Sequence, residues 1–173
     1  MHPSSMNNMQ KCIDILNLNK NLNVLDVGGR GLKRDRSYYK LLQKYTKKYD
    51  IADITEGLNV NIIMPEFYSI PVDDNHYDLI VSGQTLEHVY NPFKLVLEMK
   101  RVLKHNGYMI IIVPSAGPRH DTVDCWRFMD DAFKAIADDC QLEIIANWID
   151  REPKDDRSFK WQDNVFIGKK PND

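Results

Sequence analysis

Apolar residues along the chain follow two spacings, one typical of helices and the other typical of buried strands. Apolar positions three and four residues apart, the helical spacing, occur in segments 5–16, 38–45, 92–103 and 130–137. Short apolar runs, several rich in β-branched residues, occupy segments 23–27, 49–54, 59–63, 77–82, 108–113, 142–148 and 164–168. Because helices alternate with strands over most of the chain, we expect βαβ units and a mainly parallel sheet.

Polar residues, prolines and glycines predict where two of these helices begin and end. The first helix follows Ser4 and Ser5, either of which is a favourable N-terminal cap. The third helix has Pro92 in its first turn, and we expect it to end at Asn106-Gly107, a sequence typical of helix ends. The next strand is then predicted to begin at Tyr108.

Segment 23–31 is predicted to be a buried strand that runs into a glycine-rich turn. A carboxylate such as that of Asp26 is costly inside an apolar strand unless it is paired or reaches the carboxyl end, where α/β proteins bind ligands. Gly28, Gly29 and Gly31 allow a tight turn whose N–H groups can approach a ligand closely. The pattern indicates a nucleotide-type site, although the spacing is not that of the dinucleotide-binding fingerprint and a tight turn without a ligand is the alternative.

A second acidic residue stands at the spacing expected for a ribose contact. Asp53 follows Gly31 by 22 positions, at the end of the next predicted strand. In nucleotide-binding α/β proteins a carboxylate at roughly 20 residues from the glycines accepts hydrogen bonds from ribose hydroxyls. Asp50, at the same spacing from Gly28, is an alternative, and a solvated loop carboxylate is the simplest explanation for either residue.

Composition limits the class of protein but does not indicate a substrate. The chain has 173 residues, of which 43% are apolar and 28% charged, so we expect one soluble globular domain. A formal net charge of -2 gives no basic surface for nucleic acid, and the longest apolar run, 108–114, is too short to span a membrane. Cys12, Cys125 and Cys140 have no C-x-x-C spacing and no signal peptide is evident, so we expect reduced thiols and a cytoplasmic location.

A series of short motifs resembles class I S-adenosylmethionine-dependent methyltransferases, and more closely a small single-domain branch often found among glycan-modifying genes. The resemblance covers residues 23–171. Its motifs, in order, are VLDVGG (24–29), ADI (52–54), GLNV (57–60), YDLIVS (77–82), LEHV (86–89), RVLK (101–104), Gly107, PS (114–115) and VDCWRF (123–128).

The resemblance implies a doubly wound, mostly parallel seven-stranded sheet with an antiparallel last strand. It also implies one methyltransferase domain over residues 1–173, with an N-terminal helix (1–20), a cofactor-binding half (23–114) and an acceptor side (115–173). The implied cofactor is S-adenosylmethionine. Its implied contacts are Asp26, Gly28, Gly29 and Gly31 around the aminopropyl and sugar parts, Asp53 on the ribose hydroxyls, Asp74 or a neighbour near the adenine, and Gln84 near the methionine part. Arg30 departs from the broader pattern, in which glycines stand two positions apart.

The residue types at this site suit a cofactor with a sulfonium cation. Asp26 and Asp53 supply negative charge, and the Walker lysine of phosphate-binding loops, in the pattern Gly-Lys-Ser/Thr, does not follow the glycines. Methyl transfer depends mainly on positioning, with a base added when a hydroxyl acceptor must lose its proton. His88 and His120 are the candidate catalytic bases, because histidine titrates near neutral pH and both residues are expected to follow strand ends. The alternative for Glu87-His88 is a structural role at the start of the next helix.

We expect methyl transfer to a small-molecule acceptor, with an oxygen of a sugar or sugar-like metabolite preferred, and we leave open a homodimer. The first alternative is a methyltransferase-like module that binds the cofactor or a partner without transferring methyl. The second is a nicotinamide-dependent oxidoreductase.

A metal-assisted 2′-hydroxyl methyltransferase is a further alternative. Gln84, Glu87, His88 and His120 are similar to the metal-binding set of RNA-end 2′-O-methyltransferases, which has two acidic residues and two histidines. Because Gln84 stands at the first acidic position and an amide binds magnesium or calcium less strongly than a carboxylate, we assign no metal from the sequence.

Overall fold

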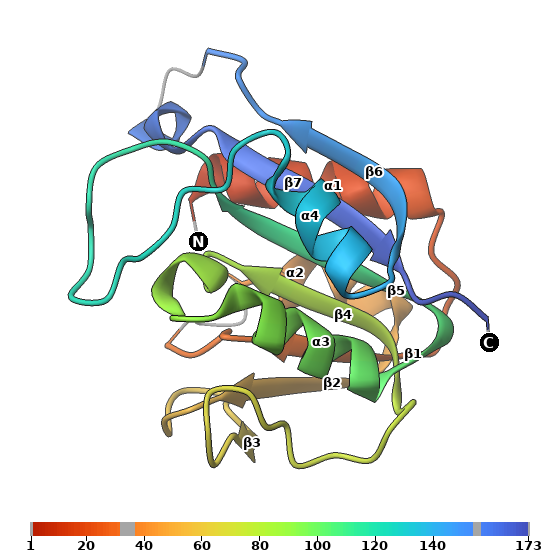
Figure 1. Ribbon diagram of the computed structural model, residues 1–173. Helices are drawn as coiled ribbons and strands as arrows, with labels where there is room; N and C mark the ends of the chain where they lie inside the picture. Colours follow the sequence, from red (N-terminus) through yellow and green to blue (C-terminus); the bar gives the residue numbers. More distant parts are fainter. Residues whose placement is uncertain (1, 32–36, 154–156, 173) are drawn as a thin grey trace.

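A seven-stranded sheet with helices on both faces forms the body of the chain (Figure 1). The computed structural model describes residues 2–31, 37–153 and 157–172. The strands are β1 (Leu22–Val27), β2 (Thr46–Asp53), β3 (Ile62–Ile63), β4 (Tyr77–Gly83), β5 (Leu103–Pro114), β6 (Glu143–Ile149) and β7 (Asp163–Lys169). They lie in the order β3-β2-β1-β4-β5-β7-β6, with β7 antiparallel to both of its neighbours and the other described pairs parallel. The predicted fold class is confirmed.

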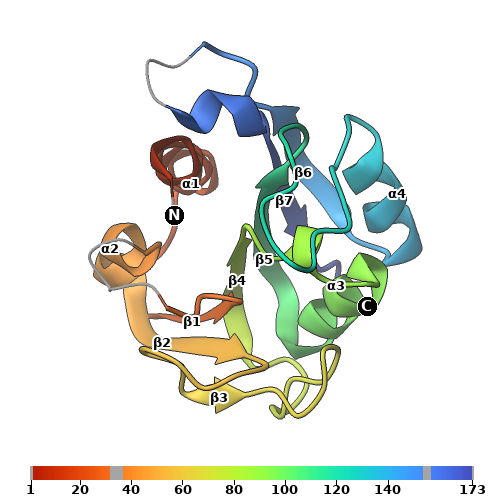
Figure 2. The same cartoon turned by 90° about the vertical axis from the view of Figure 1, so that its left-hand side faces the viewer.

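The described helices divide between the two faces of the sheet (Figure 2). The helices are α1 (Pro3–Leu16), α2 (Tyr39–Leu42), α3 (Pro92–Val102) and α4 (Ala132–Asp139), with 3-10 helices η2 (Gln43–Tyr45), η3 (Leu86–His88) and η4 (Arg157–Trp161). Met9 of α1 and Leu42 of α2 belong to one apolar core, whereas Val96 of α3 and Phe133 of α4 belong to the other. Among the described helices, none is long and apolar enough to cross a membrane.

The first helix begins two residues earlier than the sequence predicts. Its N-terminal cap is His2, whose Nδ1 accepts a hydrogen bond from the Ser5 backbone N–H at 3.4 Å, and Pro3 occupies the first turn. The prediction of a Ser4 or Ser5 cap is therefore wrong. Ser5 is instead buried, and its hydroxyl lies 2.6 Å from the Tyr38 hydroxyl, which joins α1 to the start of α2.

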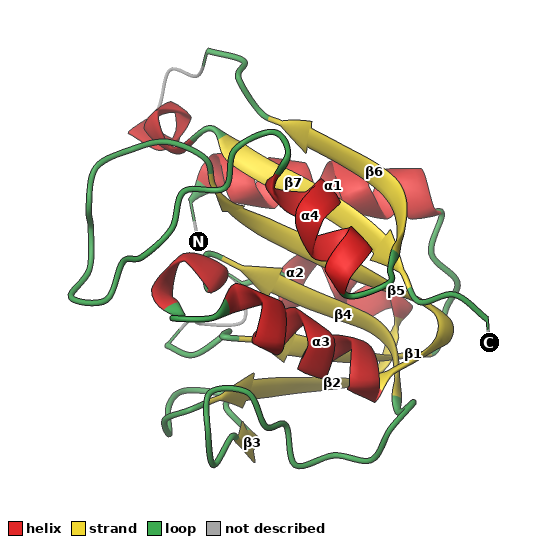
Figure 3. Ribbon diagram, viewed as in Figure 1, coloured by secondary structure: helices red, strands yellow, loops and turns green. Residues whose placement is uncertain are grey.

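The third helix ends four residues before the predicted turn, at Val102. Leu103 already pairs with Tyr77 as the first residue of β5, so Asn106-Gly107 lies within that strand (Figure 3). The register between β4 and β5 shifts after this pair, and Asn106 has a φ of 61°. The same residue types that end helices also accommodate a bulge in a strand, which is why the sequence placed the boundary wrongly.

The edge strand β3 has two residues where the sequence predicts five. The Asn61 side chain takes the place of ladder pairing, because its Oδ1 accepts from the Ile51 N–H at 2.7 Å and its Nδ2 donates to the Asp50 carboxylate. Asn59, with a φ of 65°, is not extended. β3 therefore pairs with β2 at Ala52 and Asp53, the last two residues of β2.

Candidate active site

The carboxyl ends of β1, β2 and β4 border a cavity of about 360 Å³. Gly28, directly after β1, lines it together with Asp53 at the end of β2 and Gln84 directly after β4. His88 of η3 lines it as well. β1 pairs with both β2 and β4, so the cavity lies where the strand order reverses, the usual ligand site of doubly wound sheets.

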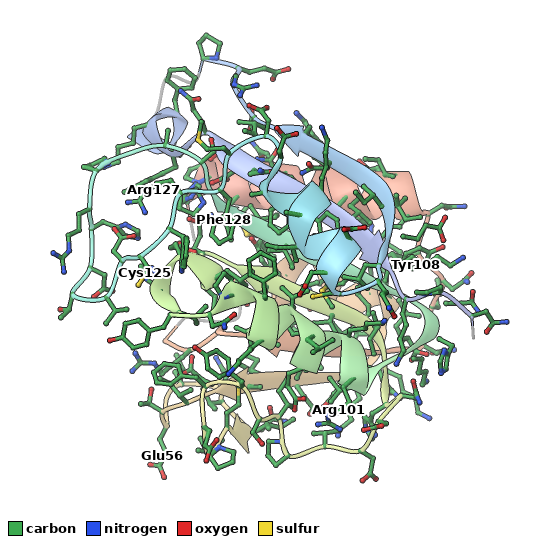
Figure 4. All side chains as sticks on the ribbon, viewed as in Figure 1. Glu56, Arg101, Tyr108, Cys125, Arg127 and Phe128 are labelled. Carbon is green, nitrogen blue, oxygen red and sulfur yellow. The ribbon has the colours of Figure 1, made fainter. Side chains whose placement is uncertain are left out.

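A second, smaller hollow of about 280 Å³ shares Gly28 and Gln84 with the first. His2, His120 and Trp161 also line it. The loop between β5 and α4 supplies His120, and its Cys125 and Arg127 are visible beside this edge of the sheet, whereas Arg101 and Tyr108 lie toward the opposite end (Figure 4). The structure therefore brings five predicted site residues, Gly28, Asp53, Gln84, His88 and His120, to one edge.

Asp26 packs against the glycine turn and lines neither hollow. It is 2% exposed, and one oxygen of its carboxylate accepts a hydrogen bond from the Tyr49 hydroxyl at 2.8 Å. Burial raises the pKa of Asp26 to about 7. A Cβ added to Gly29 would overlap this carboxylate, so the absence of a side chain at Gly29 lets the turn close over Asp26.

The turn itself depends on glycine at its first position. The Gly28 N–H donates to the Ala52 carbonyl at 2.8 Å, its φ is 82°, and a Cβ there would overlap the Thr85 side chain. Gly31 also has a positive φ, 79°, but a Cβ there would meet open space. Of the three predicted glycines, Gly28 is the one that lies at the cavity wall.

Asp53 is oriented by hydrogen bonds within its own turn and by the nearby guanidinium of Arg30. Its Oδ1 accepts hydrogen bonds from Thr55, at 3.1 Å from the backbone N and 3.2 Å from the hydroxyl. The Arg30 Nε lies 3.5 Å from the same oxygen. Asp50, the alternative ribose contact, is buried within the sheet, where the Tyr77 hydroxyl donates a hydrogen bond to it at 2.9 Å. Asp53 is therefore the carboxylate that reaches the cavity.

Asp74 lies at the opposite end of the sheet, and its assignment to the adenine is wrong. It precedes β4 at the amino end of that strand, and its Oδ1 lies 2.5 Å from the Arg101 guanidinium. Met64 and Phe67, which follow β3, line the cavity instead. The sequence shows both only as apolar residues after the edge strand. The apolar pattern alone does not tell whether such a residue lies in the core or lines a cavity.

Gln84 connects the two hollows to the last strand. It has a φ of 57°, and its side-chain amide donates to Asp163 Oδ1 at 3.1 Å. The carboxylate of Asp163, at the start of β7, also lies 3.5 Å from His2 Nε2. Burial raises the pKa of Asp163. Sequence reasoning missed Asp163 and His2 because the contacts join chain segments far apart in sequence.

His88 and His120 lie side by side, with ring centroids 4.9 Å apart. His88 Nδ1 lies 2.6 Å from the Val123 carbonyl oxygen, and His120 Nδ1 lies 3.0 Å from Asp124 Oδ2. Trp161 packs on the other side of His120, with a centroid distance of 4.7 Å. The histidine pair therefore borders both hollows, His88 the first and His120 the second.

Two charged residues hold the His120 ring in place. Arg127 donates to both oxygens of Asp124, and the backbone N–H of His120 donates to Asp124 Oδ2 at 2.9 Å. The guanidinium holds the pKa of Asp124 well below its usual range. Burial lowers the pKa of His120, which keeps its imidazole neutral near neutral pH.

The comparison with known families narrows what this site is. Residues 34–111, which include Asp53, Gln84 and His88, match the family model described as a methyltransferase domain. The fold matches the crystal structure of a SAM-dependent methyltransferase from Aquifex aeolicus with a TM-score of 0.68, over 97% of this chain and 93% of that chain, at 19% identity. The family model covers less than half of this chain, and a structural likeness at 19% identity shows that the fold is shared with methyltransferases.

This chain is also similar to two methyltransferases that are named for different target atoms. The ubiquinone/menaquinone biosynthesis C-methyltransferase UbiE of Psychromonas ingrahamii is 25% identical over 162 residues, 82% of this chain and 64% of that protein. The 1,6-didemethyltoxoflavin-N1-methyltransferase of Burkholderia thailandensis, solved with its substrate and S-adenosylhomocysteine, has a TM-score of 0.71 and 13% identity over 97% of this chain and 79% of that chain. The chain spans less than two thirds of the length of the curated relatives it matches. These likenesses leave the methyl acceptor open.

Proposed function

We propose that this chain transfers the methyl group of S-adenosylmethionine to an oxygen of a small-molecule acceptor, with a sugar or sugar-like metabolite as the preferred class. The observation that carries the proposal is an imidazole held by an ionised carboxylate, His120 on Asp124, at the same sheet edge as Gly28 and Asp53. An oriented base is needed when a hydroxyl must lose its proton, and not when the acceptor is already an anion.

The residues of the larger cavity suit the cofactor. Its volume of about 360 Å³ lies within the usual range of ligand pockets, roughly 300–1,000 Å³. Asp53 would accept hydrogen bonds from the ribose hydroxyls, and Met64 and Phe67 would pack on the adenine. Gln84 would face the methionine part. Asp26 would act indirectly, by fixing the glycine turn.

The chemistry divides between the cofactor and the protein. S-adenosylmethionine, when bound, would supply an electrophilic methyl carbon, and the electron pair of its bond to sulfur would stay on sulfur as the acceptor oxygen takes the methyl group. His120 would accept the proton of the acceptor hydroxyl at Nε2, because His120 Nδ1–H donates a hydrogen bond to the ionised Asp124 and this contact fixes the tautomer. Asp124 and Arg127 then hold the imidazolium in place.

The surroundings of His120 support a sugar-like acceptor. The Trp161 ring packs beside His120, and His2 and Gln84 line the same hollow. An aromatic face with a few convergent polar groups is a common way to bind a small polar molecule.

We further propose that residues 1–173 act as one domain. A homodimer and a cytoplasmic location are also part of this proposal, the latter because Cys12, Cys125 and Cys140 are free thiols.

A second candidate is a module that binds ligand without transferring methyl. The observation that favours it is the approach of Arg30 Nε to 3.5 Å from Asp53 Oδ1, since the guanidinium competes with ribose hydroxyls for that carboxylate. Such a module would bind cofactor weakly and would show no turnover with any acceptor.

The test is calorimetric titration with S-adenosylhomocysteine, followed by an acceptor screen. We expect micromolar binding that Asp53→Asn weakens and that the matched control Asp74→Asn, whose carboxylate lies outside the cavity, leaves unchanged. A nicotinamide dinucleotide should give no heat. Release of S-adenosylhomocysteine with hydroxylated sugars, lost in His120→Ala, supports the proposal; binding without turnover on any hydroxyl, carboxylate or amine would favour the module instead.

A further inference from the structure

Glu87, His88 and His120 form a cluster in which one donor atom from each residue lies within 4.8 Å of the others. Glu87 and His88 belong to η3, directly after β4, and His120 belongs to the loop after β5. β4 and β5 are paired neighbours, so the sheet itself brings these residues together. His88 lines the first hollow and His120 the second, whereas the buried Glu87 lines neither.

Hydrogen bonding leaves the same nitrogen free on both histidines. The Val123 carbonyl oxygen only accepts, so His88 Nδ1 must donate to it and Nε2 carries the lone pair. The Asp124 carboxylate accepts from Arg127 at both oxygens and accepts from His120 Nδ1 as well, so Nε2 is again the unprotonated nitrogen. A donor hydrogen bond from one ring nitrogen to a carbonyl or carboxylate, with the other nitrogen free, is the arrangement typical of metal-binding histidines.

Glu87 supplies the carboxyl group of the cluster. The residue is 0% exposed, and neither carboxylate oxygen accepts a hydrogen bond from the part of the chain that the structure describes. Its Oε1 lies 3.5 Å from His88 Nε2, the nitrogen that carries the lone pair. Burial raises the pKa of Glu87 to about 8, so a metal ion that binds this carboxylate would displace its proton. The two oxygens without a hydrogen-bond partner leave room for such a ligand.

We propose that Glu87, His88 and His120 bind a divalent first-row transition metal ion, such as zinc or cobalt, at the wall between the two hollows. Two neutral imidazoles and one carboxylate suit these ions, whereas magnesium and calcium prefer oxygen ligands. Metal–ligand bonds of about 2.0–2.2 Å place neighbouring donors roughly 3–3.5 Å apart. The donor atoms, which lie within 4.8 Å of one another, must therefore approach each other by about 1 Å or more when the ion binds.

Three protein ligands leave an open coordination position, as in catalytic metal sites. The role of the ion rests on the proposed function: it would hold the acceptor hydroxyl and lower the pKa of that hydroxyl. In the metal-loaded protein His120 Nε2 is a ligand, so the acceptor proton would pass to solvent in place of that nitrogen. Asp124 would then orient a metal ligand, the outer role that carboxylates commonly have around zinc.

The test uses the metal alone. Co²⁺ is titrated into the purified full chain, without a polyhistidine tag and in a Cys125→Ser background, and the visible absorption of the bound ion is followed. We expect one ion per chain, displaced by Zn²⁺ and not by Mg²⁺. Glu87→Gln and His120→Ala should each weaken cobalt binding by about tenfold or more. Loss of a partner that only hydrogen-bonds to a metal ligand already weakens metal binding by roughly 10- to 100-fold. His76→Ala, a histidine at the amino end of β4, should bind as the parent chain does.

Two results would overturn the metal site: no cobalt absorption, or equal cobalt affinity in His120→Ala and His76→Ala. If Glu87→Gln does not fold, His120→Ala on the exposed loop decides alone. Titration of the same samples with S-adenosylhomocysteine separates this inference from the proposed function. Cofactor binding without metal binding removes the metal site only, and metal binding without cofactor binding removes the proposed methyl transfer only.

Discussion

Arg127 donates to both carboxylate oxygens of Asp124, at 2.5 Å to Oδ1 and 2.9 Å to Oδ2. The guanidinium also donates to the Pro118 and Gly117 carbonyls, at 2.7 and 3.2 Å, so one side chain ties together both ends of the loop. Charge-assisted bidentate pairs are stronger and more directional than single hydrogen bonds. Arg127 therefore fixes the position of Asp124, and Asp124 fixes the ring of His120.

The substitution Asp124→Asn should lower the rate of methyl transfer by roughly a hundredfold, the lower end of what a positioned base contributes. The amide can no longer require His120 to donate from Nδ1, and the imidazolium loses its counter-charge. The apparent pKa of the rate profile should fall, because the ionised carboxylate opposes the effect of burial on the pKa of His120. The measurement is kcat against pH with whichever acceptor the screen identifies.

Asp131→Asn provides the matched control for this change. Asp131 is an exposed carboxylate that pairs with Lys134 on the surface, 2.7 Å away. We expect it to keep the parent rate and pH profile. Equal loss in both variants would contradict the role assigned to Asp124, as would an Asp124→Asn rate that falls without any change in the pH profile.

Removal of the Arg30 side chain should strengthen cofactor binding. The pair of Arg30 with Asp53 is partly exposed, so its contribution is about 0.2–1 kcal/mol, and releasing the carboxylate should tighten S-adenosylhomocysteine binding by at most about fivefold. Arg30→Ala is compared with Arg151→Ala, which breaks the surface pair with Asp130. Weaker binding in Arg30→Ala would show instead that the guanidinium contacts the cofactor.

The sequence predicted well those parts of the structure that depend on local pattern. Apolar runs located all seven strands, because a buried strand needs an unbroken apolar segment. The glycine turn and Asp53 were found by spacing along the chain, and both border the cavity. Their contacts with the cofactor stay predictions.

The remaining features depend on contacts between distant segments, which one sequence does not reveal. Asn106-Gly107 has the same local preference at a helix end and in a strand bulge, and only the pairing of Leu103 with Tyr77 decides between them. Asp74 was placed by analogy along the chain, but its partner Arg101 holds it at the far end of β4. The link from Gln84 to Asp163 joins residues 79 positions apart.

The stability of the protein should fall as the pH rises from about 4 to about 7, through Asp26. Burial raises the pKa of Asp26 to about 7 in the folded protein, with Asp53 adding to this effect and the Tyr49 hydroxyl opposing it. In the unfolded chain the carboxyl has a pKa of about 4, so across this window the folded state retains a proton that the unfolded state releases. Asp26→Asn should therefore gain stability relative to the parent by a few kcal/mol between pH 4 and pH 8. Urea unfolding at both pH values measures this, and a stability difference that does not change with pH would contradict the buried, protonated carboxyl.

The comparison of Gly28→Ala with Gly31→Ala separates backbone strain from side-chain overlap in the glycine turn. Both glycines have positive φ, 82° and 79°, so both variants incur the backbone cost of about 1–2 kcal/mol. Only at Gly28 does the added methyl meet Thr85, whose side chain lines the cofactor cavity. Gly28→Ala should therefore lower the thermal midpoint further than Gly31→Ala and abolish measurable S-adenosylhomocysteine binding, while Gly31→Ala weakens it only a few-fold. Equal losses of binding and stability in the two variants would mean that the conformation of the turn, and not the space beside Thr85, is what the cofactor site requires at Gly28.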